Sequence, residues 1–432
     1  MTVVAAPFAQ ARPTRRSLVE IGAFAAAVFL LLVYSQGWET PLTGGGDETA
    51  DSDLIRSLFL PAYAAGIGLL ALTPWRTVLG LVRQPFLVLL VLIATVSIFW
   101  SVAPDQTERR IFALVFTTLG GVVLAARYSW PRLAEVLAAS FAILAVFSLL
   151  AGLFVPSIGR MTEIFPGAWR GLWPEKNAFG GNMAFGAAIC AAAAFLNPRR
   201  AGIWWAMALL SFLLLLMSTS KTALVSLLLG AAALALVWSV RRGPVFSVVA
   251  TWCAVVVLGL VACVALFASD YVFGLLGKDA TLTGRTEIWA AVMHQIHQRP
   301  WVGFGYAAIW DETGRWGPLA WIVHDAGFRP DHAHNSWLEQ WLSLGLVGLG
   351  AWTAFFCQTL VANVVALYRS PGAYLALPFF VIYALMTLTE SIAVIYNDMR
   401  WVIFVTLAVK LALPDAPARP AASPARPKYA RA

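Results

Sequence analysis

The sequence predicts an all-α polytopic membrane protein with about 12 transmembrane helices. Of the 432 residues, 60% are hydrophobic and only 12% are charged, whereas soluble domains are about half apolar and a quarter charged. Twelve spans of roughly 20 residues would use about 240 residues and leave the rest for loops and tails. The four cysteines all lie inside apolar runs, so the sequence supports neither a disulfide framework nor a zinc knuckle.

Twelve apolar runs are long enough to be considered as spans. They lie near 17–35, 57–74, 85–101, 110–126, 134–155, 178–196, 202–218, 222–239, 245–268, 335–362, 372–390 and 399–413. The first run follows three arginines and has no small-residue cleavage site before Gln36–Trp38. We therefore expect a retained helix rather than a signal peptide.

The net charge of +8 predicts membrane orientation rather than nucleic-acid binding. With the N-terminus inside, the even-numbered turns are short and basic, as in 197–200 and 240–243, which is the pattern of the positive-inside rule. The predicted organisation is a cytoplasmic N-terminal segment (1–16), a transmembrane domain (17–413) and a disordered basic cytoplasmic tail (414–432). Both termini are then cytoplasmic.

The outer face carries the longer loops. A segment of about 65 residues, 269–333, contains seven tryptophan or tyrosine residues, and we expect it to form a large, partly helical outer loop between the ninth and tenth helices. No Walker or Rossmann glycine pattern is present, so ATP-driven transport is not indicated. The function is predicted to lie on the outer face.

Lys221 is an outer-face cation in a tight turn between two apolar helices, within Met217–Thr222. One interpretation is a lysine that extends to the membrane interface. The other is an anion ligand, because the adjacent hydroxyls and the start of a helix supply further donors.

Arg285 opens an expected helix that runs to Gln298, with Thr283 as its predicted N-cap. Trp289, Val292 and Ile296 recur at helical spacing and predict the buried face of this helix. Arg285 falls on the same face, so we expect it to point toward the membrane domain. A cation at a helix N-terminus is unfavourable, and a bound phosphate would reverse this. A solvated arginine is the alternative.

His334 precedes the tenth helix, for which Ser336 and Glu339 fit a capping box. A histidine near a helix N-terminus is expected to be neutral near pH 7 and able to accept a proton. The segment Asp331–His334 suggests a metal site as an alternative, as does a pairing of His294 with His297, but neither supplies a convincing set of ligands. We predict no metal and no cofactor.

Several cations and one base at the outer leaflet suit a pyrophosphate-bearing lipid, with the cations holding the leaving group. Four motifs carry a family resemblance: Ser218–Lys221, Gly284–Trp289, Arg299–Gly305 and His334–Glu339, with Glu175–Asn177 as a fifth element. In their order and loop positions they resemble the O-antigen ligase and polymerase superfamily of bacterial envelope assembly.

The resemblance implies a metal-independent, inverting glycosyltransferase of the C type in the bacterial inner membrane, with its active site facing the periplasm. The implied donor is an undecaprenyl-diphosphate-linked O-antigen, the implied acceptor is a lipid A–core sugar, and no nucleic acid is involved. Lys221 and Arg285 would bind the pyrophosphate, and His334 would activate the acceptor hydroxyl. Relatives commonly have arginine where this chain has Lys221, and a lysine lacks the bidentate fork. Further phosphate contacts are expected from Arg109, Arg110, Arg170 and Lys176.

Within the superfamily the rival function is an O-antigen polymerase, with a protein O-oligosaccharyltransferase as a further relative. From another class, a lipid-linked glycan transporter has a similar number of spans. A transporter is expected to show internal inverted repeats and a midplane site, and the sequence shows no obvious repeat.

Overall fold

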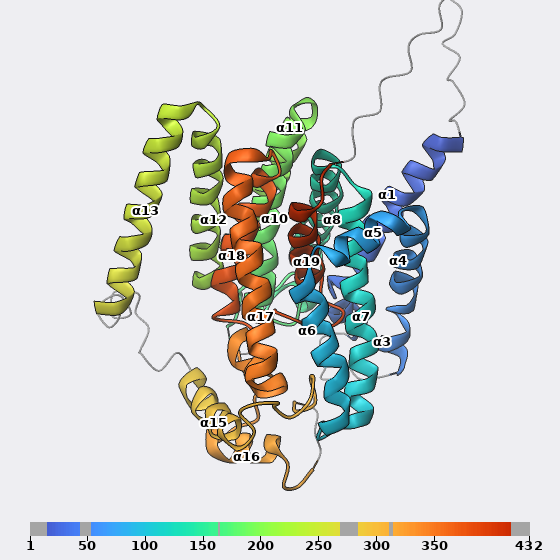
Figure 1. Ribbon diagram of the computed structural model, residues 1–432, viewed down its shortest axis with the longest axis vertical. Coiled ribbons are helices and arrows are strands. Elements are labelled where there is room, and N and C mark those ends of the chain that lie inside the picture. The colour runs from blue at the N-terminus through green and yellow to red at the C-terminus, as the bar shows by residue number, and fades with distance from the viewer. Residues whose placement is uncertain (1–14, 44–52, 163–164, 268–283, 311–313, 416–432) are drawn as a thin grey trace, which may run out of the picture.

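The computed structural model describes residues 15–43, 53–162, 165–267, 284–310 and 314–415, and these form a bundle of α-helices (Figure 1). Within these ranges, seven helices are long and apolar enough to cross a membrane, or eight if one bent pair counts as a span, and three shorter helices are also apolar. A polytopic all-α membrane protein is therefore confirmed, and the number of twelve spans remains a prediction.

The helices coincide closely with the predicted apolar runs. Their bounds are α1 Arg15–Tyr34, α2 Glu39–Thr43, α3 Asp53–Ser57, α4 Leu60–Leu72, α5 Pro74–Val82, α6 Pro85–Val96, α7 Pro104–Arg127, α8 Trp130–Phe154, α9 Pro156–Gly159, α10 Lys176–Leu196, α11 Ala201–Ser218, α12 Lys221–Val240, α13 Pro244–Phe267, α15 Arg285–Gln298, α16 Pro318–Ala326, α17 Ser336–Arg369, α18 Ala373–Thr387 and α19 Met399–Ala412. Short 3₁₀ helices cover 97–100 and 198–200.

The third predicted span is preceded by a helix that was not predicted, α5. The helix from Pro74 to Val82 is bent by 88° relative to the segment Pro85–Trp100. Between them, Gln84 has φ −123° and ψ 63°, because the residue before a proline is driven out of the helical region. The chain therefore turns sharply before it enters the bundle.

Helix α10 lies at the centre of the bundle. It packs against α8, α11, α12 and α18, and 89% of its apolar stretch is buried. Its sequence is rich in alanine and glycine, and such small residues let helix backbones approach closely where lipid offers no hydrophobic drive for association. Large apolar side chains on the outer helices, including α4, α6, α11 and α13, are exposed, as expected of lipid-facing surfaces.

The charged segments that were predicted to be cytoplasmic meet at one end of the bundle. Glu20 pairs with Arg127 at 2.6 Å, and Glu135 pairs with Arg132 at 2.7 Å and Arg200 at 3.1 Å. The acidic residues of this end thus all lie against basic partners. This arrangement agrees with the predicted topology, in which these turns share one side.

At the opposite end, α15 packs on α16 and on α17 (Figure 1). Ile288, Val292 and Ile296 of α15 form the centre of a second apolar core, so the predicted buried face of this helix and its end at Gln298 are confirmed. The predicted N-cap Thr283 lies outside the described residues, as do 269–283 of the outer loop and 416–432 of the tail.

Candidate functional site

The centre of the candidate site is Glu390, in the connector between α18 and α19. Its Oε1 is 3.0 Å from a guanidinium nitrogen of Arg285. Its Oε2 is 3.3 Å from Nδ1 of His334 and 3.8 Å from Nε2 of His332. The rings of the two histidines are in contact, with centroids 3.9 Å apart and planes tilted by 40°. We call these four residues the Glu390 cluster.

His334 is held in place by the backbone at the start of α17. It has a φ of 49°, a left-handed conformation that non-glycine residues seldom adopt and that often marks functional sites. The next residue, Asn335, is the N-cap, and its side chain accepts hydrogen bonds from the amides of Trp337 and Leu338. This turn of the chain directs the His334 ring toward the connector.

The predicted capping box of Ser336 and Glu339 is wrong. The Ser336 hydroxyl instead donates to the carbonyl of Glu390 at 2.7 Å and accepts from the amides of Ile392 and Ala393. Glu339 accepts hydrogen bonds from the amide of Ala333 and from the side chains of Ser391 and Trp310. Asn335 already accepts hydrogen bonds from the free amides at the helix end. Ser336 and Glu339 are therefore available to bond the segments that pack against α17.

Electrostatics in the cluster favour an ionised carboxylate beside cations. Burial by itself would raise the pKa of Glu390, but contacts with His332 and His334 and the charge of Arg285 outweigh burial and hold that pKa well below its usual range. For His332, burial opposes the charged form, yet the nearby carboxylates, above all Glu390, raise its pKa above the ordinary value. Glu390 thus provides a fixed negative charge for three basic groups.

The geometry also determines which nitrogen of His334 is available for chemistry. An ionised carboxylate can only accept hydrogen bonds, so the tautomer that suits Glu390 carries its proton on Nδ1. The other nitrogen, Nε2, then has a free lone pair and can accept a proton. A carboxylate orients a catalytic histidine in the same manner in serine proteases.

The cluster also contains the side chains that best fit a metal ion among the described residues. The ligand atoms of His332, His334 and Glu390 lie within 4.8 Å of one another, and two histidines with one glutamate form a known zinc ligand set. The third ligand comes from a residue that the sequence did not connect with the histidines. However, Arg285 contacts the same carboxylate at 3.0 Å, and its positive charge disfavours a divalent cation there.

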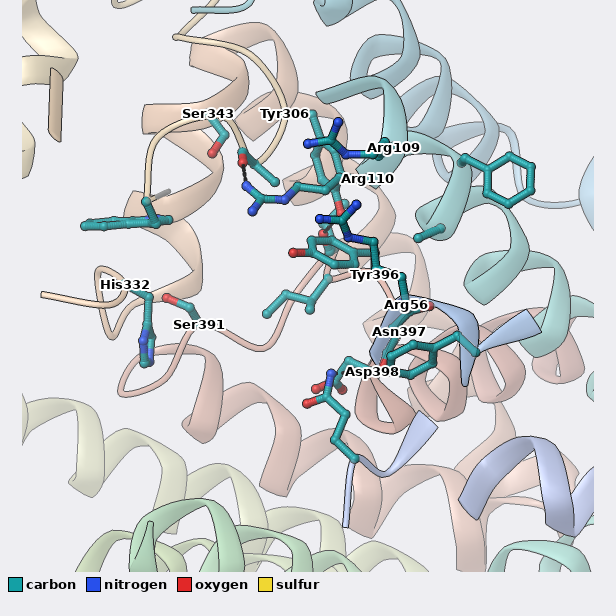
Figure 2. Close-up of a pocket in the computed structure, with 18 of the residues that line it drawn as sticks. Arg56, Arg109, Arg110, Tyr306, His332, Ser343, Ser391, Tyr396, Asn397 and Asp398 are labelled. Carbon is teal, nitrogen blue, oxygen red and sulfur yellow. Dashed lines mark hydrogen bonds between the residues drawn. The ribbon is translucent and has the colours of Figure 1, made fainter. Parts of the chain in front are cut away.

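Next to the cluster lies a cavity of about 730 Å³. Figure 2 shows His332 and Ser391 on one side of this cavity and Arg109 and Arg110 of α7 on the other. Arg110 is buried, donates to the carbonyl of Ala307 and lies over a tyrosine ring. The cavity is wide enough for a ligand of several ring systems.

The structure brings together some of the predicted site residues and separates others. Arg285 and His334 meet at Glu390, and Arg109 and Arg110 line the cavity. Lys221, Arg170 and Lys176 are not among the residues that line it.

The last three have other surroundings. Lys221 is exposed at the start of α12, where the neighbouring Ser220 bonds Asn177 at 3.1 Å. Arg170 donates to the carbonyls of three residues of its own loop, and Lys176 lies 3.4 Å above the ring of Phe165.

Several residues of the site were not predicted from the sequence. They are Glu390 in the cluster and, in the cavity wall, Arg56, Tyr306, Gln340, Tyr396 and Arg400. The one available signal was the polar run Thr389–Ser391 and Asn397–Arg400 that interrupts the apolar C-terminal sequence. Nothing in it indicates that this connector meets residues 56 to 105 positions earlier in the chain.

Comparison with known proteins identifies a matching family model and a similar bacterial protein. A sequence model described as O-antigen ligase matches residues 206–353, which include Lys221, Arg285 and His334. The exopolysaccharide production protein ExoQ of Rhizobium meliloti (strain 1021) is 30% identical over 326 residues, which are 68% of this chain and 72% of the relative. The chain belongs to the O-antigen ligase and polymerase superfamily. Members of this superfamily are glycosyltransferase-like enzymes. The family model covers residues 206–353 only, so Glu390, Arg109 and part of the cavity lie outside the matched range.

Proposed function

We propose that the protein transfers a preassembled glycan from undecaprenyl diphosphate to a sugar hydroxyl at the periplasmic face of the bacterial inner membrane. The observation that carries this proposal is the Glu390 cluster. It combines a histidine with a free Nε2, a carboxylate that orients it, and an arginine 3.0 Å from the same carboxylate. Glycosyl transfer from a diphosphate requires these groups: a base for the acceptor hydroxyl and a cation for the leaving group.

In the proposed step, the acceptor oxygen attacks the anomeric carbon from the face opposite the diphosphate. The new C–O bond forms as the bond between that carbon and the diphosphate oxygen breaks, and the electron pair leaves with undecaprenyl diphosphate. His334 takes the proton of the acceptor hydroxyl on Nε2. Arg285, with Lys221, holds the negative charge of the leaving group. The anomeric configuration inverts, and no metal or nucleotide is needed.

Contacts with the rest of the lipid-linked donor are proposed for Arg170 and Lys176, which belong to the same outer side of the chain in the predicted topology. Arg285 is less than one-fifth exposed, so its charge acts in a medium that screens it less than water does. Charge stabilisation of the leaving group is then the largest catalytic contribution that we expect.

The acceptor that we propose first is a sugar of lipid A–core, which makes the protein an O-antigen ligase, as the description of the matching family model suggests. A specific observation favours a second candidate. The relative that aligns over two-thirds of this chain is named for exopolysaccharide production, and a polymerase would extend a glycan on the same carrier lipid. The two functions share the donor, the site and the chemistry.

The test is transfer by the purified protein in detergent with undecaprenyl-diphosphate glycan as donor. One reaction contains lipid A–core and another contains only a second equivalent of the lipid-linked glycan. A shifted core band on a gel identifies the ligase, and a longer carrier-linked glycan identifies the polymerase. Activity that persists in both Arg285→Ala and His334→Ala would exclude the proposed site. If the parent protein forms neither product, the lipid-linked glycan transporter becomes the favoured function.

A further inference from the structure

The cavity beside the Glu390 cluster has walls of mixed polarity. Tyr306 and Tyr396 contribute aromatic rings, Gln340 and Asn397 contribute amides, and Arg109 and Glu108 contribute charges of both signs. An anion site would show an excess of cations, and a lipid site would lack charged groups. Donors and acceptors of both kinds beside flat rings are suited to a saccharide, whose hydroxyls both donate and accept hydrogen bonds and whose C–H faces are apolar.

Some of these polar groups have unused hydrogen-bonding capacity. The Gln340 side chain is 3% exposed, and its Nε2 donates to the carbonyl of Ala393. Its Oε1 is buried with no hydrogen-bond partner among the described residues, and leaving such a group unpaired costs about 1–3 kcal/mol. Arg109 lines the same cavity, and the described part of the chain supplies no hydrogen bond or ion pair to its guanidinium. The Arg109 guanidinium therefore borders space that a polar ligand can fill.

The position of the cavity indicates which substrate it serves. His332 lines the cavity, and its ring contacts that of His334 with centroids 3.9 Å apart. Arg285 is not a lining residue and contacts the other oxygen of Glu390. Of the four residues of the Glu390 cluster, only His332 lines the cavity, so a sugar there approaches the cluster from the side of His332, away from the cation assigned to the diphosphate.

From this geometry we infer that the cavity between α7, α17 and the α18–α19 connector is the binding site of the acceptor saccharide. The inference rests on the proposed function for the word acceptor, since transfer defines which sugar is attacked. It assigns Arg109 to hydrogen bonds with sugar hydroxyls or their acidic substituents.

Two variants test the assignment without touching the Glu390 cluster. Arg109→Gln removes a charged donor, and Ala113→Phe, one helical turn further along α7 and also in the cavity wall, fills space. Arg315→Gln is the matched control, because Arg315 is an exposed arginine of the outer segment that does not line the cavity. Thermal melting and size-exclusion elution report folding. If Ala113→Phe does not fold, Arg109→Gln decides alone.

The measurement is equilibrium binding in detergent with three probes and no reaction. Two are saccharides, the delipidated core oligosaccharide and the free repeat-unit oligosaccharide of the host; the third is undecaprenyl diphosphate without a glycan. We expect at least one saccharide to bind the parent protein and to bind the variants about tenfold or more weakly, the loss of one charged hydrogen bond. Binding of undecaprenyl diphosphate and of all probes to the control should not change.

Unchanged saccharide binding in the folded variants overturns the assignment, as does a selective loss of undecaprenyl diphosphate binding. So does a parent protein that binds neither saccharide. The result is distinguishable from failure of the proposed function. Saccharide binding that the variants lose, together with no transfer by the parent, rejects the glycosyltransferase and retains the saccharide site. Transfer with an unchanged acceptor KM in the variants retains the glycosyltransferase and rejects the saccharide site.

Discussion

Replacement of Glu390 by glutamine isolates the role of its charge, because the two side chains have nearly the same shape. The carboxylate accepts from Arg285 on Oε1 and from His334 on Oε2. An amide has one accepting oxygen and one NH₂ group that only donates. In Glu390→Gln, the NH₂ group of the amide must therefore oppose an N–H donor of Arg285 or of His334, unless His334 changes tautomer.

The change of tautomer has a defined consequence. If the amide oxygen stays with Arg285, the NH₂ group faces His334, whose Nδ1 must then accept and whose proton moves to Nε2. The nitrogen that is proposed to take the acceptor proton is then blocked. A general base contributes about 10²–10⁴-fold to a rate, so we expect kcat to fall by about that factor in Glu390→Gln.

The assay is the initial rate of glycan transfer by purified protein at saturating donor and acceptor. Glu287→Gln on α15 is the matched control, since Glu287 is exposed and accepts a hydrogen bond from the adjacent Thr286; its rate should equal that of the parent. Part of the effect can come from stability, because a hydrogen bond to a charged group contributes about 1.5–3 kcal/mol, so melting temperatures accompany the rates. A folded Glu390→Gln protein with a rate within about threefold of the parent would refute the reasoning.

Three further predictions concern stability. Asn335→Ala removes the N-cap of α17 and should cost about 1 kcal/mol, measured as a lowered melting temperature, whereas Asn335→Asp should retain it. Gly345→Ala should abolish the folded monodisperse peak, because φ is +65° and a Cβ would lie 2.2 Å from the Trp301 carbonyl group; a normal elution profile would contradict the packing described. Because Glu390 raises the pKa of His332, this contact stabilises the fold below the ordinary histidine pKa, and the stabilisation is lost as pH rises through the raised value. The difference in melting temperature between the parent and His332→Gln should therefore shrink with rising pH, and a constant difference would exclude the ion pair.

Much of the fold follows from the sequence because lipid imposes a simple rule. Apolar runs of spanning length must be helical, since backbone polar groups have no partner in the hydrocarbon, and the observed helices coincide with those runs. The buried face of α15 was also predictable, because Val292 and Ile296 recur at helical spacing. The unpredicted helix α5 shows the limit of the rule: a short amphipathic segment with an 88° bend has no spanning signal.

The candidate site was only half predictable. Arg285 and His334 stand in short polar motifs, and their chemistry is apparent from the residue types. Glu390 is separated from them by 105 and 56 positions, and the encounter depends on how α17 and α18 pack. The capping box failed for a related reason. Asn335 and Ser336 are both residue types that cap helices well. The Ser336 hydroxyl donates to the carbonyl of Glu390 in the connector, so Asn335 is the cap, and the sequence alone does not show this contact.

The most direct test of the central claim is the identity of the lipid product, measured by mass spectrometry of a transfer reaction with the purified protein, EDTA and no nucleotide. The account predicts one equivalent of undecaprenyl diphosphate for each glycan transferred, and almost none from His334→Ala. Release of undecaprenyl monophosphate, or a reaction that stops with EDTA and resumes with zinc, would contradict it. The latter result would assign the His332, His334 and Glu390 side chains to a metal ion instead of a base and its orienting carboxylate.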